Sequence, residues 1–274
     1  MNFITIDHEK CKQDGICAAT CPMGLIELKD EKSFPTPIEK ADEICIACGH
    51  CIAVCPHGAL SLKSMKSEQC TRIQKELQIS PEQAEQFLRS RRSVRVYKEK
   101  PVEKELIIRL IDTARYSPSG HNSQPLKWLV IYDTAQLQRL TAHVADWMRY
   151  MLKKQPEFAK SIHIDRVIEK WESGIDNICR KAPHLIIAYA HQNNRMAPAS
   201  ANIALTYLEL AAYSLGLGAC WAGYFNAAAT LWQPLKQALL LSEGESSYGA
   251  MMIGYAKFQY QRIPLRNEAK VKWF

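Results

Sequence analysis

The stretch CIACGHCIAVCP, from Cys45 to Pro56, decides the fold of the N-terminal region. It is a complete C-x2-C-x2-C-x3-C-P run. A related stretch, CKQDGICAATCP, runs from Cys11 to Pro22 and carries Asp14 where the second cysteine of the run is expected. Similar segments follow the two runs, MGLIELK after the first and HGALSLK after the second. Two copies of one structural unit are the simplest interpretation of this repeat.

The spacing of these cysteines is typical of iron–sulfur cluster ligation. Three cysteines of such a run reach one cluster, and the cysteine before the proline serves the other cluster. One cluster is expected to take Cys21, Cys45, Cys48 and Cys51. The other is expected to take Cys11, Cys17 and Cys55, with Asp14 at its fourth corner. Zinc sites also use C-x2-C pairs, but seven cysteines with two Cys-Pro endings fit the cluster pattern better.

This segment resembles the bacterial two-cluster ferredoxins over nearly its whole length. The resemblance implies one of two clusters at the Asp14 corner. In ferredoxins of this pattern, an aspartate there accompanies either a three-iron cluster or a four-iron cluster with one labile, carboxylate-bound iron. A hard carboxylate oxygen holds iron less softly than a thiolate does. In the alternative interpretation, Asp14 only caps the turn before Gly15. The second cluster is therefore expected to be [4Fe-4S] or [3Fe-4S].

Composition indicates a globular protein in a reducing compartment. The 274 residues are 47% hydrophobic and 23% charged, which is ordinary for a folded domain. The N-terminal MNFITIDHEK lacks the apolar segment of a secretory signal, and the apolar stretch from Asn202 to Trp221 is interrupted by Glu209 and two glycines. Seven of the ten cysteines fall in the two runs, which favours metal ligation over disulfides. We therefore expect a cytoplasmic protein with no membrane partner.

Charge is divided unevenly along the chain. Residues 1–64 carry six Lys or Arg against nine Asp or Glu, a net charge of −3, whereas the remainder carries 29 against 19. A basic body suits a phosphate-bearing cofactor. The basic residues are dispersed and match no nucleic-acid-binding motif, so no nucleic acid partner is expected.

The chain is expected to divide into a two-cluster domain (1–64), a polar linker (65–79) and an α+β body (80–274). Short strands are expected in NFITID and ALSLK, with a turn in SFPTP. Ser80, Pro81 and Gln83 form the capping pattern of a helix start. Further helices are expected at about 102–115, over most of 134–180 and at 199–215, and strands in KWLVIYD, HLIIAYA and SYGAMMIGYA. Helices segregated around a few strands predict an α+β fold.

The body resembles the flavin-dependent nitroreductase family through three landmarks in the same order. These are RRSVR (91–95) with the following SPSGHNSQP loop (117–125), LGLGACWAGYF (215–225), and the C-terminal GYAKFQYQRIPLRNEAKVKW (254–273). The resemblance spans about residues 80–274 and is poor from 134 to 180. It implies an α+β homodimer with FMN at the subunit interface. The all-round apolar helix at 199–215 suits such an interface.

The first landmark supplies candidate phosphate and ring contacts. Arg91, Arg92 and Ser93 offer charge-assisted donors that can clamp a phosphate, although RRSVR alone would fit a solvated helix end equally well. The resemblance implies that Arg95 lies near the pyrimidine edge of the flavin, where a cation stabilises the reduced, anionic form.

The other landmarks imply further FMN contacts. The loop that reaches a flavin held mainly by the partner subunit corresponds to Ser117, Pro118, Ser119, Asn122 and Gln124. The backbone under the redox-active ring nitrogen corresponds to Trp221, Ala222, Gly223 and Tyr224. Arg262 and Arg266 lie near the C-terminal phosphate contacts, and Arg266 is the preferred candidate.

The expected function is that of an FMN-dependent oxidoreductase with a fused iron–sulfur relay. FMN carries the chemistry, so no catalytic side chain is expected. The acceptor would be a small, electron-poor organic molecule such as a nitroaromatic, quinone or activated alkene, and the donor NAD(P)H or a ferredoxin. One alternative is an electron-transfer module with a closed flavin face, whereas an enzyme needs an open pocket lined by residues such as Trp147, Tyr150, Phe158 or Trp171. The other alternative is a flavin-less sensor.

Overall fold

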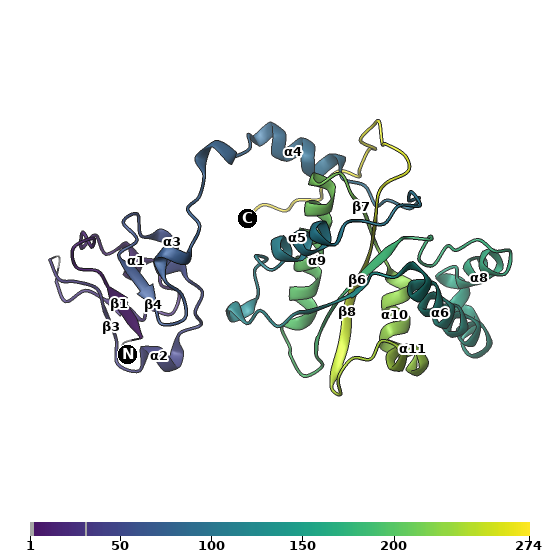
Figure 1. Ribbon diagram of the computed structural model, residues 1–274, viewed down its shortest axis with the longest axis horizontal. Coiled ribbons are helices and arrows are strands. Elements are labelled where there is room, and N and C mark those ends of the chain that lie inside the picture. Colours follow the sequence, from purple (N-terminus) through teal and green to yellow (C-terminus); the bar gives the residue numbers. More distant parts are fainter. Residues whose placement is uncertain (1–2, 31) are drawn as a thin grey trace. The chain divides into compact units, whose positions relative to one another are not determined.

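The computed structural model describes residues 3–30 and 32–274, which form two compact units. One unit comprises the chain up to Gln78 together with His121–Ser123, and the other comprises Ile79–Gly120 and Gln124–Phe274 (Figure 1). The predicted divisions after residues 64 and 79 stay predictions. No helix in the described ranges is both long and apolar enough to cross a membrane.

The first unit is built from short elements around the cysteine loops. Its strands pair antiparallel as β1 (Ile4–Ile6) with β4 (Leu60–Leu62) and β2 (Ile26–Glu27) with β3 (Thr36–Pro37). Its helices are α1 (Ile16–Ala19), α2 (Ala41–Ile44) and α3 (His50–Val54), followed by the 3₁₀ turns η1 (Ser67–Gln69) and η2 (Lys75–Leu77). Strands are thus present in both predicted end segments, although Asn2 lies outside the described residues. The predicted SFPTP turn instead ends in β3.

The backbone repeats itself in the two cysteine loops. Gly15 (φ 70°) precedes α1 and Gly49 (φ 73°) precedes α3, at equivalent positions of the two runs. Two residues before each glycine, Gln13 (φ 59°) and Ala47 (φ 48°) are also left-handed. Glycine adopts this conformation without steric cost, whereas other residues rarely do. The two loops therefore follow the same path despite their different sequences.

A four-stranded antiparallel sheet forms the centre of the second unit. The strand order is β5 (Lys127–Ile131), β6 (His184–His191), β8 (Glu245–Gly254) and β7 (Gly218–Trp221). The register pairs Ile187 with Ala250 and Ala219 with Ile253, and a bulge lies at Ala188/Tyr189. All four strands are therefore joined into one sheet although β7 and β8 come late in the chain.

Helices cover both faces of this sheet (Figure 1). Leu185 and Ile187 of β6 face a core formed with α6 (Thr134–Lys154), α8 (Ile164–Glu172), α10 (Gly223–Leu231) and α11 (Gln233–Ala238). Ile186 and Ala188 face a second core formed with α5 (Lys104–Ala114) and α9 (Ala197–Ser214). Because successive side chains of a strand point to opposite faces, a strand between two cores reads as a continuous apolar run. The remaining helical elements are α4 (Pro81–Ser90), η3 (Gly120–Asn122) and α7 (Pro156–Ser161).

Most predicted elements of the second unit are confirmed, with several differences. The capping box at Ser80 is present, and 134–180 is largely helical. Helix α5 begins at Lys104 rather than near Val102, whose N–H donates to His184 Nε2 at 2.8 Å. Trp147, predicted as a pocket residue, lies instead in the core with 3% exposure because it faces inward from α6. Strand β7 was not predicted.

Helix α9 is not buried on all sides within one chain. Ile203, Tyr207 and Tyr213 are exposed, whereas Leu205, Leu208 and most alanines of the helix are buried. Ile203 and Tyr207 lie one helical turn apart on the same face. Tyr213 points elsewhere, with its ring against Phe87 and its hydroxyl hydrogen-bonded to Ser90. The helix therefore offers Ile203 and Tyr207 at the surface of the second unit.

Candidate functional sites

A cavity in the first unit brings together the four cysteines predicted for the complete cluster. Its thiol-bearing residues are Cys21, Cys45, Cys48 and Cys51, and its apolar walls include Phe3, Ile4, Leu25, Ile26 and Leu62. None of the ten cysteines forms a disulfide. The donor set and the apolar walls fit an iron–sulfur cluster, which thiolates hold in protein surroundings that limit solvent.

Backbone amides approach the cysteine sulfurs. The N–H of Leu25 donates to Cys21 Sγ at 3.4 Å, that of Ala47 to Cys45 Sγ at 3.3 Å, and that of Ala59 to Cys55 Sγ at 3.4 Å. Hydrogen bonds to ligand sulfurs stabilise the thiolate form and influence the reduction potential of a cluster. Both predicted ligand sets receive such bonds.

Burial opposes ionisation of the inner thiols in the described chain. It raises the pKa of Cys51 to about 11, and the neighbouring Cys48 and Cys21 thiolates add to the rise. Burial likewise raises the pKa of Cys17, with smaller contributions from Cys11 and Asp14. Buried thiols of this kind ionise when iron binds, because metal coordination favours the thiolate.

Cys11, Asp14 and Cys17 are close enough to interact electrostatically, so three of the four predicted members of the second set are neighbours. Asp14 Oδ1 accepts the Ile16 N–H at 3.3 Å, which is the contact expected of a turn-capping aspartate. Within residues 3–30 and 32–274 no three His, Cys, Asp or Glu side chains converge as ligands of one metal ion do. The ligands of a cluster bind separate iron atoms. The ligand role of Asp14 stays a prediction.

A pocket in the second unit, here called the ring pocket, joins two of the landmarks. It is lined by Arg95, Asn177, Ile178, Arg180, Cys220, Trp221, Gly223, Tyr224 and Met252. Arg95 precedes the sheet in the chain, whereas Trp221 to Tyr224 connect β7 to α10. The fold therefore unites a cation with the backbone segment that the resemblance assigns to the flavin ring.

The backbone at the ring pocket is accessible for polar contacts. Helix α10 begins at Gly223, and the first N–H groups of a helix have no partner within it. A Cβ atom added at Gly223 would meet no heavy atom within 4 Å, so open space lies above this residue. The Ala222 N–H is used differently, because it donates to the Ala250 carbonyl at 2.8 Å. Gly223 and Tyr224 thus offer the free amides here, and the helix end adds partial positive charge.

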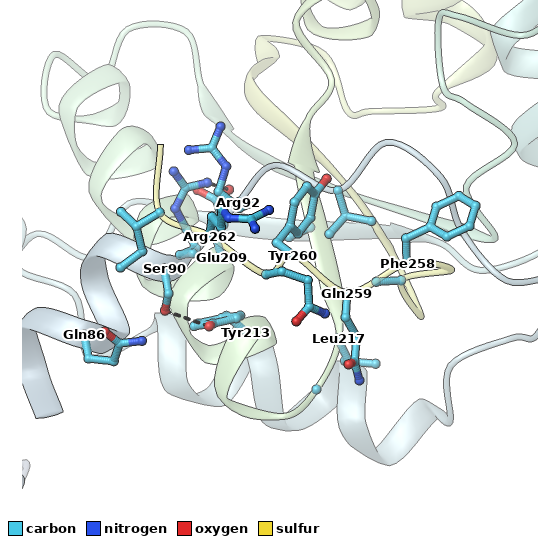
Figure 2. A pocket seen from close by; sticks show the side chains of 17 residues that line it. Gln86, Ser90, Arg92, Glu209, Tyr213, Leu217, Phe258, Gln259, Tyr260 and Arg262 are labelled. Atoms are coloured by element: carbon cyan, nitrogen blue, oxygen red, sulfur yellow. Dashed lines mark hydrogen bonds and ion pairs between the residues drawn. The ribbon is translucent and has the colours of Figure 1, made fainter. Parts of the chain in front are cut away.

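A second cavity, here called the arginine pocket, has a volume of about 460 Å³ (Figure 2). Arg91, Arg92 and Arg262 line it together with Glu209. Arg91 Nη1 donates to Glu209 Oε1 at 2.8 Å, and this carboxylate is only 7% exposed. Three cations against one carboxylate leave a net positive pocket that fits a phosphate. Arg266, the preferred C-terminal candidate, is absent from its lining.

The remaining predicted contacts lie in other places. Ser93 is not among the lining residues of the two pockets, and its carbonyl accepts from Arg95 and from the Tyr260 hydroxyl, each at 3.3 Å. The loop residues Ser117, Pro118, Ser119, Asn122 and Gln124 do not line either pocket. Ser119 Oγ accepts the Gln124 N–H at 3.0 Å, and Asn122 and Gln124 are left-handed.

Arg180 and Asn177 line the ring pocket although neither was predicted from the sequence. Both lie just before β6, at the end of the stretch where the resemblance was poor. The positive charge of Arg180 reaches the pocket, since Arg95 and Arg180 both oppose the rise that burial causes in the pKa of Cys220. Burial also raises the pKa of Tyr224, and Arg180 opposes that rise. The available signal was a basic pair, Arg180 and Lys181, directly before a buried strand.

Comparisons with known proteins give a match in each of the two units of the chain. Residues 88–255 match the Nitroreductase family, and residues 9–59 match the 4Fe-4S dicluster domain. A Bacillus subtilis (strain 168) protein named "Putative NAD(P)H nitroreductase YfhC" is 24% identical over 66% of this chain and 90% of its own.

Two solved structures share the fold of the second unit. A nitroreductase with bound FMN from Desulfitobacterium hafniense DCB-2 is 20% identical, covers 72% of this chain and 100% of its own, and gives a TM-score of 0.58. A nitroreductase with bound FMN from Bacteroides fragilis NCTC 9343 is 22% identical, covers 68% and 93%, and gives a TM-score of 0.53.

Proposed function

Because the chain belongs to the nitroreductase family and carries an N-terminal 4Fe-4S dicluster domain, we propose that it is an FMN-dependent oxidoreductase with a fused iron–sulfur electron relay. The observation that carries the proposal is the ring pocket, where Arg95 and the start of α10 meet over the uncovered backbone of Gly223. Two related structures of the same fold bind FMN.

The residues of the two pockets divide the work of holding FMN. In our proposal Arg92 and Arg262 bind the phosphate, while the Arg91–Glu209 pair keeps Arg91 oriented at the pocket wall. Ser93 and Arg266 stay candidates for the same phosphate. Arg95 and the amides of Gly223 and Tyr224 stabilise negative charge on the reduced ring. Bound FMN supplies hydride transfer and the exchange between one-electron and two-electron chemistry.

The four-cysteine set holds one [4Fe-4S] cluster, and Cys11, Cys17, Cys55 and Asp14 hold the second cluster. The clusters supply single-electron transfer. The amides of Leu25, Ala47 and Ala59 hold the sulfurs in position and, by donating to them, stabilise the ligated form. An aspartate at one corner is expected to make that iron more labile than thiolate ligation would.

The reaction is the reduction of a small, electron-poor organic acceptor. A nitro group, for example, takes two electrons and two protons to give a nitroso group and one water. The electrons come from NAD(P)H, in keeping with the name of the Bacillus relative, or from a ferredoxin that feeds the clusters. No acid or base side chain is assigned, because solvent can supply these protons.

A homodimer is part of the proposal. Ile203 and Tyr207, exposed on one face of α9, give the second unit an apolar surface suited to a second copy. The loop residues Ser117, Pro118, Ser119, Asn122 and Gln124 would then contact the flavin of the other subunit. The expectation of a cytoplasmic protein stays a prediction.

Anaerobic purification with iron and flavin quantitation tests this function. We expect one FMN per chain, iron for two clusters, and reoxidation of the reduced flavin by nitroaromatics or quinones. Arg95→Gln should lower the flavin midpoint potential, because it removes a cation beside the reduced ring, whereas Arg166→Gln on the exposed face of α8 should not. A flavin-free preparation would contradict the proposal. Electron transfer to a ferredoxin but to no organic acceptor would favour the electron-transfer module.

The Asp14 assignment has its own test. Asp14→Cys should replace any three-iron EPR signal of the isolated protein with that of a four-iron cluster. Asp42→Cys, in α2 of the same unit, is the matched control and should leave the cluster type unchanged. An identical cluster in wild type and Asp14→Cys would show that Asp14 is only a turn residue.

A further inference from the structure

We infer that a cationic groove beside the ring pocket selects reactants that carry a carboxylate or phosphate. The inference deepens the proposed function and rests on it. The groove has a volume of about 820 Å³, which is within the range of small-molecule sites. The charged residues that line it are five basic ones and two acidic ones. The basic residues are Arg95, Lys98, Lys100, Arg180 and Lys181, and the acidic residues are Glu99 and Asp176.

The groove continues directly into the ring pocket. Arg95, Asn177 and Arg180 line both cavities. A molecule whose reducible group lies in the ring pocket can therefore extend its other end along the groove. Arg180 stands at the junction and is half-buried, so an ion pair there is less screened by solvent than one at the open surface.

Most of the positive charge in the groove is not neutralised by the protein. Lys100 pairs with Glu103 at 3.2 Å and lies over the Tyr255 ring. Within the described part of the chain, no ion pair involves Arg95, Lys98, Arg180 or Lys181. Four cations therefore face a groove in which only Glu99 offers an exposed carboxylate.

The negative charge of Asp176 lowers the net positive charge of the groove, but its carboxylate is held by the backbone rather than by one of these cations. Oδ1 accepts the N–H groups of Ile178 and Cys179, and Oδ2 accepts that of Lys181, all at 2.9 Å. These three bonds fix the loop through Arg180 and Lys181, both of which are left-handed at φ 58° and 50°. Two adjacent residues in this conformation are costly and persist only where other contacts hold them. The buried aspartate supplies those contacts.

The neutral walls of the groove indicate the shape of the molecule. Val96, Tyr97, Pro101, Ile175 and Pro183 line it, and Ile175 is 49% exposed. Apolar and aromatic surface beside cations suits a flat, conjugated molecule with one anionic substituent. An aromatic carboxylate acceptor has this chemistry, and so does a pyridine nucleotide with an additional phosphate. Of these two molecules, the aromatic carboxylate is the simpler match, because a single negative charge on it is enough to pair with the cations of the groove.

Calorimetric titration of the oxidised, full-length protein tests the groove without any turnover. The probes are para-nitrobenzoate and its neutral analogue para-nitrobenzamide. We expect the carboxylate to bind at least about 10-fold more tightly, since one charge-assisted hydrogen bond is worth about that factor. Arg180→Gln and Lys181→Gln should each remove most of this preference and leave the neutral probe within about twofold of wild type, and Arg180→Lys should restore part of it. Arg166→Gln is the control for total charge.

A second measurement distinguishes the two sources of the anion. The same variants are mixed with NADPH and with NADH, and flavin reduction is followed by stopped flow. If the variants lose selectivity for NADPH over NADH but bind para-nitrobenzoate as the wild type does, the groove binds the electron donor. If they lose the preference for para-nitrobenzoate but keep the wild-type selectivity for NADPH, the groove binds the acceptor. Equal behaviour of wild type and Arg180→Gln toward all four probes overturns the inference. If the Arg180→Gln variant still binds FMN and reduces para-nitrobenzamide, the proposed function stands even though the groove inference fails. If the wild-type protein lacks FMN but still prefers the carboxylate probe, the groove inference stands and the proposed function fails.

Discussion

The two units of the chain are stabilised in different ways. Among the described residues of the first unit, the packed core cluster contains seven buried residues, two of which are the cysteines Cys17 and Cys51, and the longest strand has three residues. The second unit has two extensive apolar cores on either side of a four-stranded sheet. A domain of fewer than about 80 residues seldom stabilises itself by apolar burial alone. We therefore expect the first unit to depend on bound clusters to fold, and the second unit to depend on packing.

The largest effect is expected from removing a cluster ligand. Cys48→Ala should leave the first unit unfolded, because cluster binding contributes much of its folding free energy. Limited proteolysis with mass spectrometry should then cut within residues 3–78 while the second unit stays intact. Cys70→Ala changes an exposed cysteine of the same unit and serves as the control. A protease-resistant first unit without iron would remove the contrast between the units.

In the second unit, a large effect is expected from deleting a core side chain. Leu205 of α9 is fully buried between the helix and the sheet. Leu205→Ala should lower the free energy of unfolding by about 2–5 kcal/mol, measured by chemical denaturation. Leu240→Ala, at a leucine that is 89% exposed, should change it by no more than about 0.5 kcal/mol. Similar losses in both variants would contradict packing as the source of stability.

A smaller effect is expected where the sheet meets α9. A Cβ atom at Gly249 would clash with Leu205 Cδ1 and approach Trp221 Cζ3 to 3.3 Å. Gly249→Ala should therefore cost about 1–3 kcal/mol of unfolding free energy. In a Leu205→Ala background the main obstacle is gone, so the same change should cost at least about 0.5 kcal/mol less. Additive losses in the double variant would show that the contact with Leu205 is unimportant.

The smallest expected effect is a pH dependence from His184. Its Nε2 accepts from the Val102 N–H and its Nδ1 donates to the Tyr132 carbonyl, so the ring is neutral. Burial lowers the pKa of His184 below the ordinary value, so the unfolded chain takes up a proton before the folded one does. The unfolding free energy should thus fall as the pH drops below about 6.5, by up to about 1.4 kcal/mol per pH unit.

Denaturation of the second unit between neutral and mildly acidic pH measures this slope. His184→Gln should flatten it. His191→Gln, at the exposed end of the same strand, should leave it as in the wild type. An unchanged slope in His184→Gln would mean that other groups cause the acid sensitivity.

The sequence predicted the two units unequally well. Cysteine spacing predicted the four cysteines that line the cavity of the first unit, Cys21, Cys45, Cys48 and Cys51, because ligand spacing in a short loop is local information. Capping residues located α4, and apolar runs located β6 and β8, for the same reason. The four-residue strand β7 escaped prediction because its partner in the sheet lies about 30 residues away, where only pairing with β8 defines it.

The proposed flavin site shows the same division. Local landmarks pointed to Arg95 and to Trp221–Tyr224, which share the ring pocket. Arg180 escaped prediction because only its pairing with Lys181 before a buried strand marks it in the sequence. The loop that a buried aspartate four residues earlier holds in place brings it to the ring pocket. The choice between Arg262 and Arg266 likewise depended on how an irregular C-terminal segment runs, which no periodic pattern encodes.

The two cysteine loops have matching backbones but carry different residues at one equivalent position. Gln13 and Gly15 on one side, and Ala47 and Gly49 on the other, set the path of each loop through their own left-handed conformations. The residue between them, Asp14 in one copy and Cys48 in the other, can thus change without a new backbone. In our proposal, the two copies of the duplicated motif therefore differ in metal chemistry through one residue, while the loop that presents it stays the same.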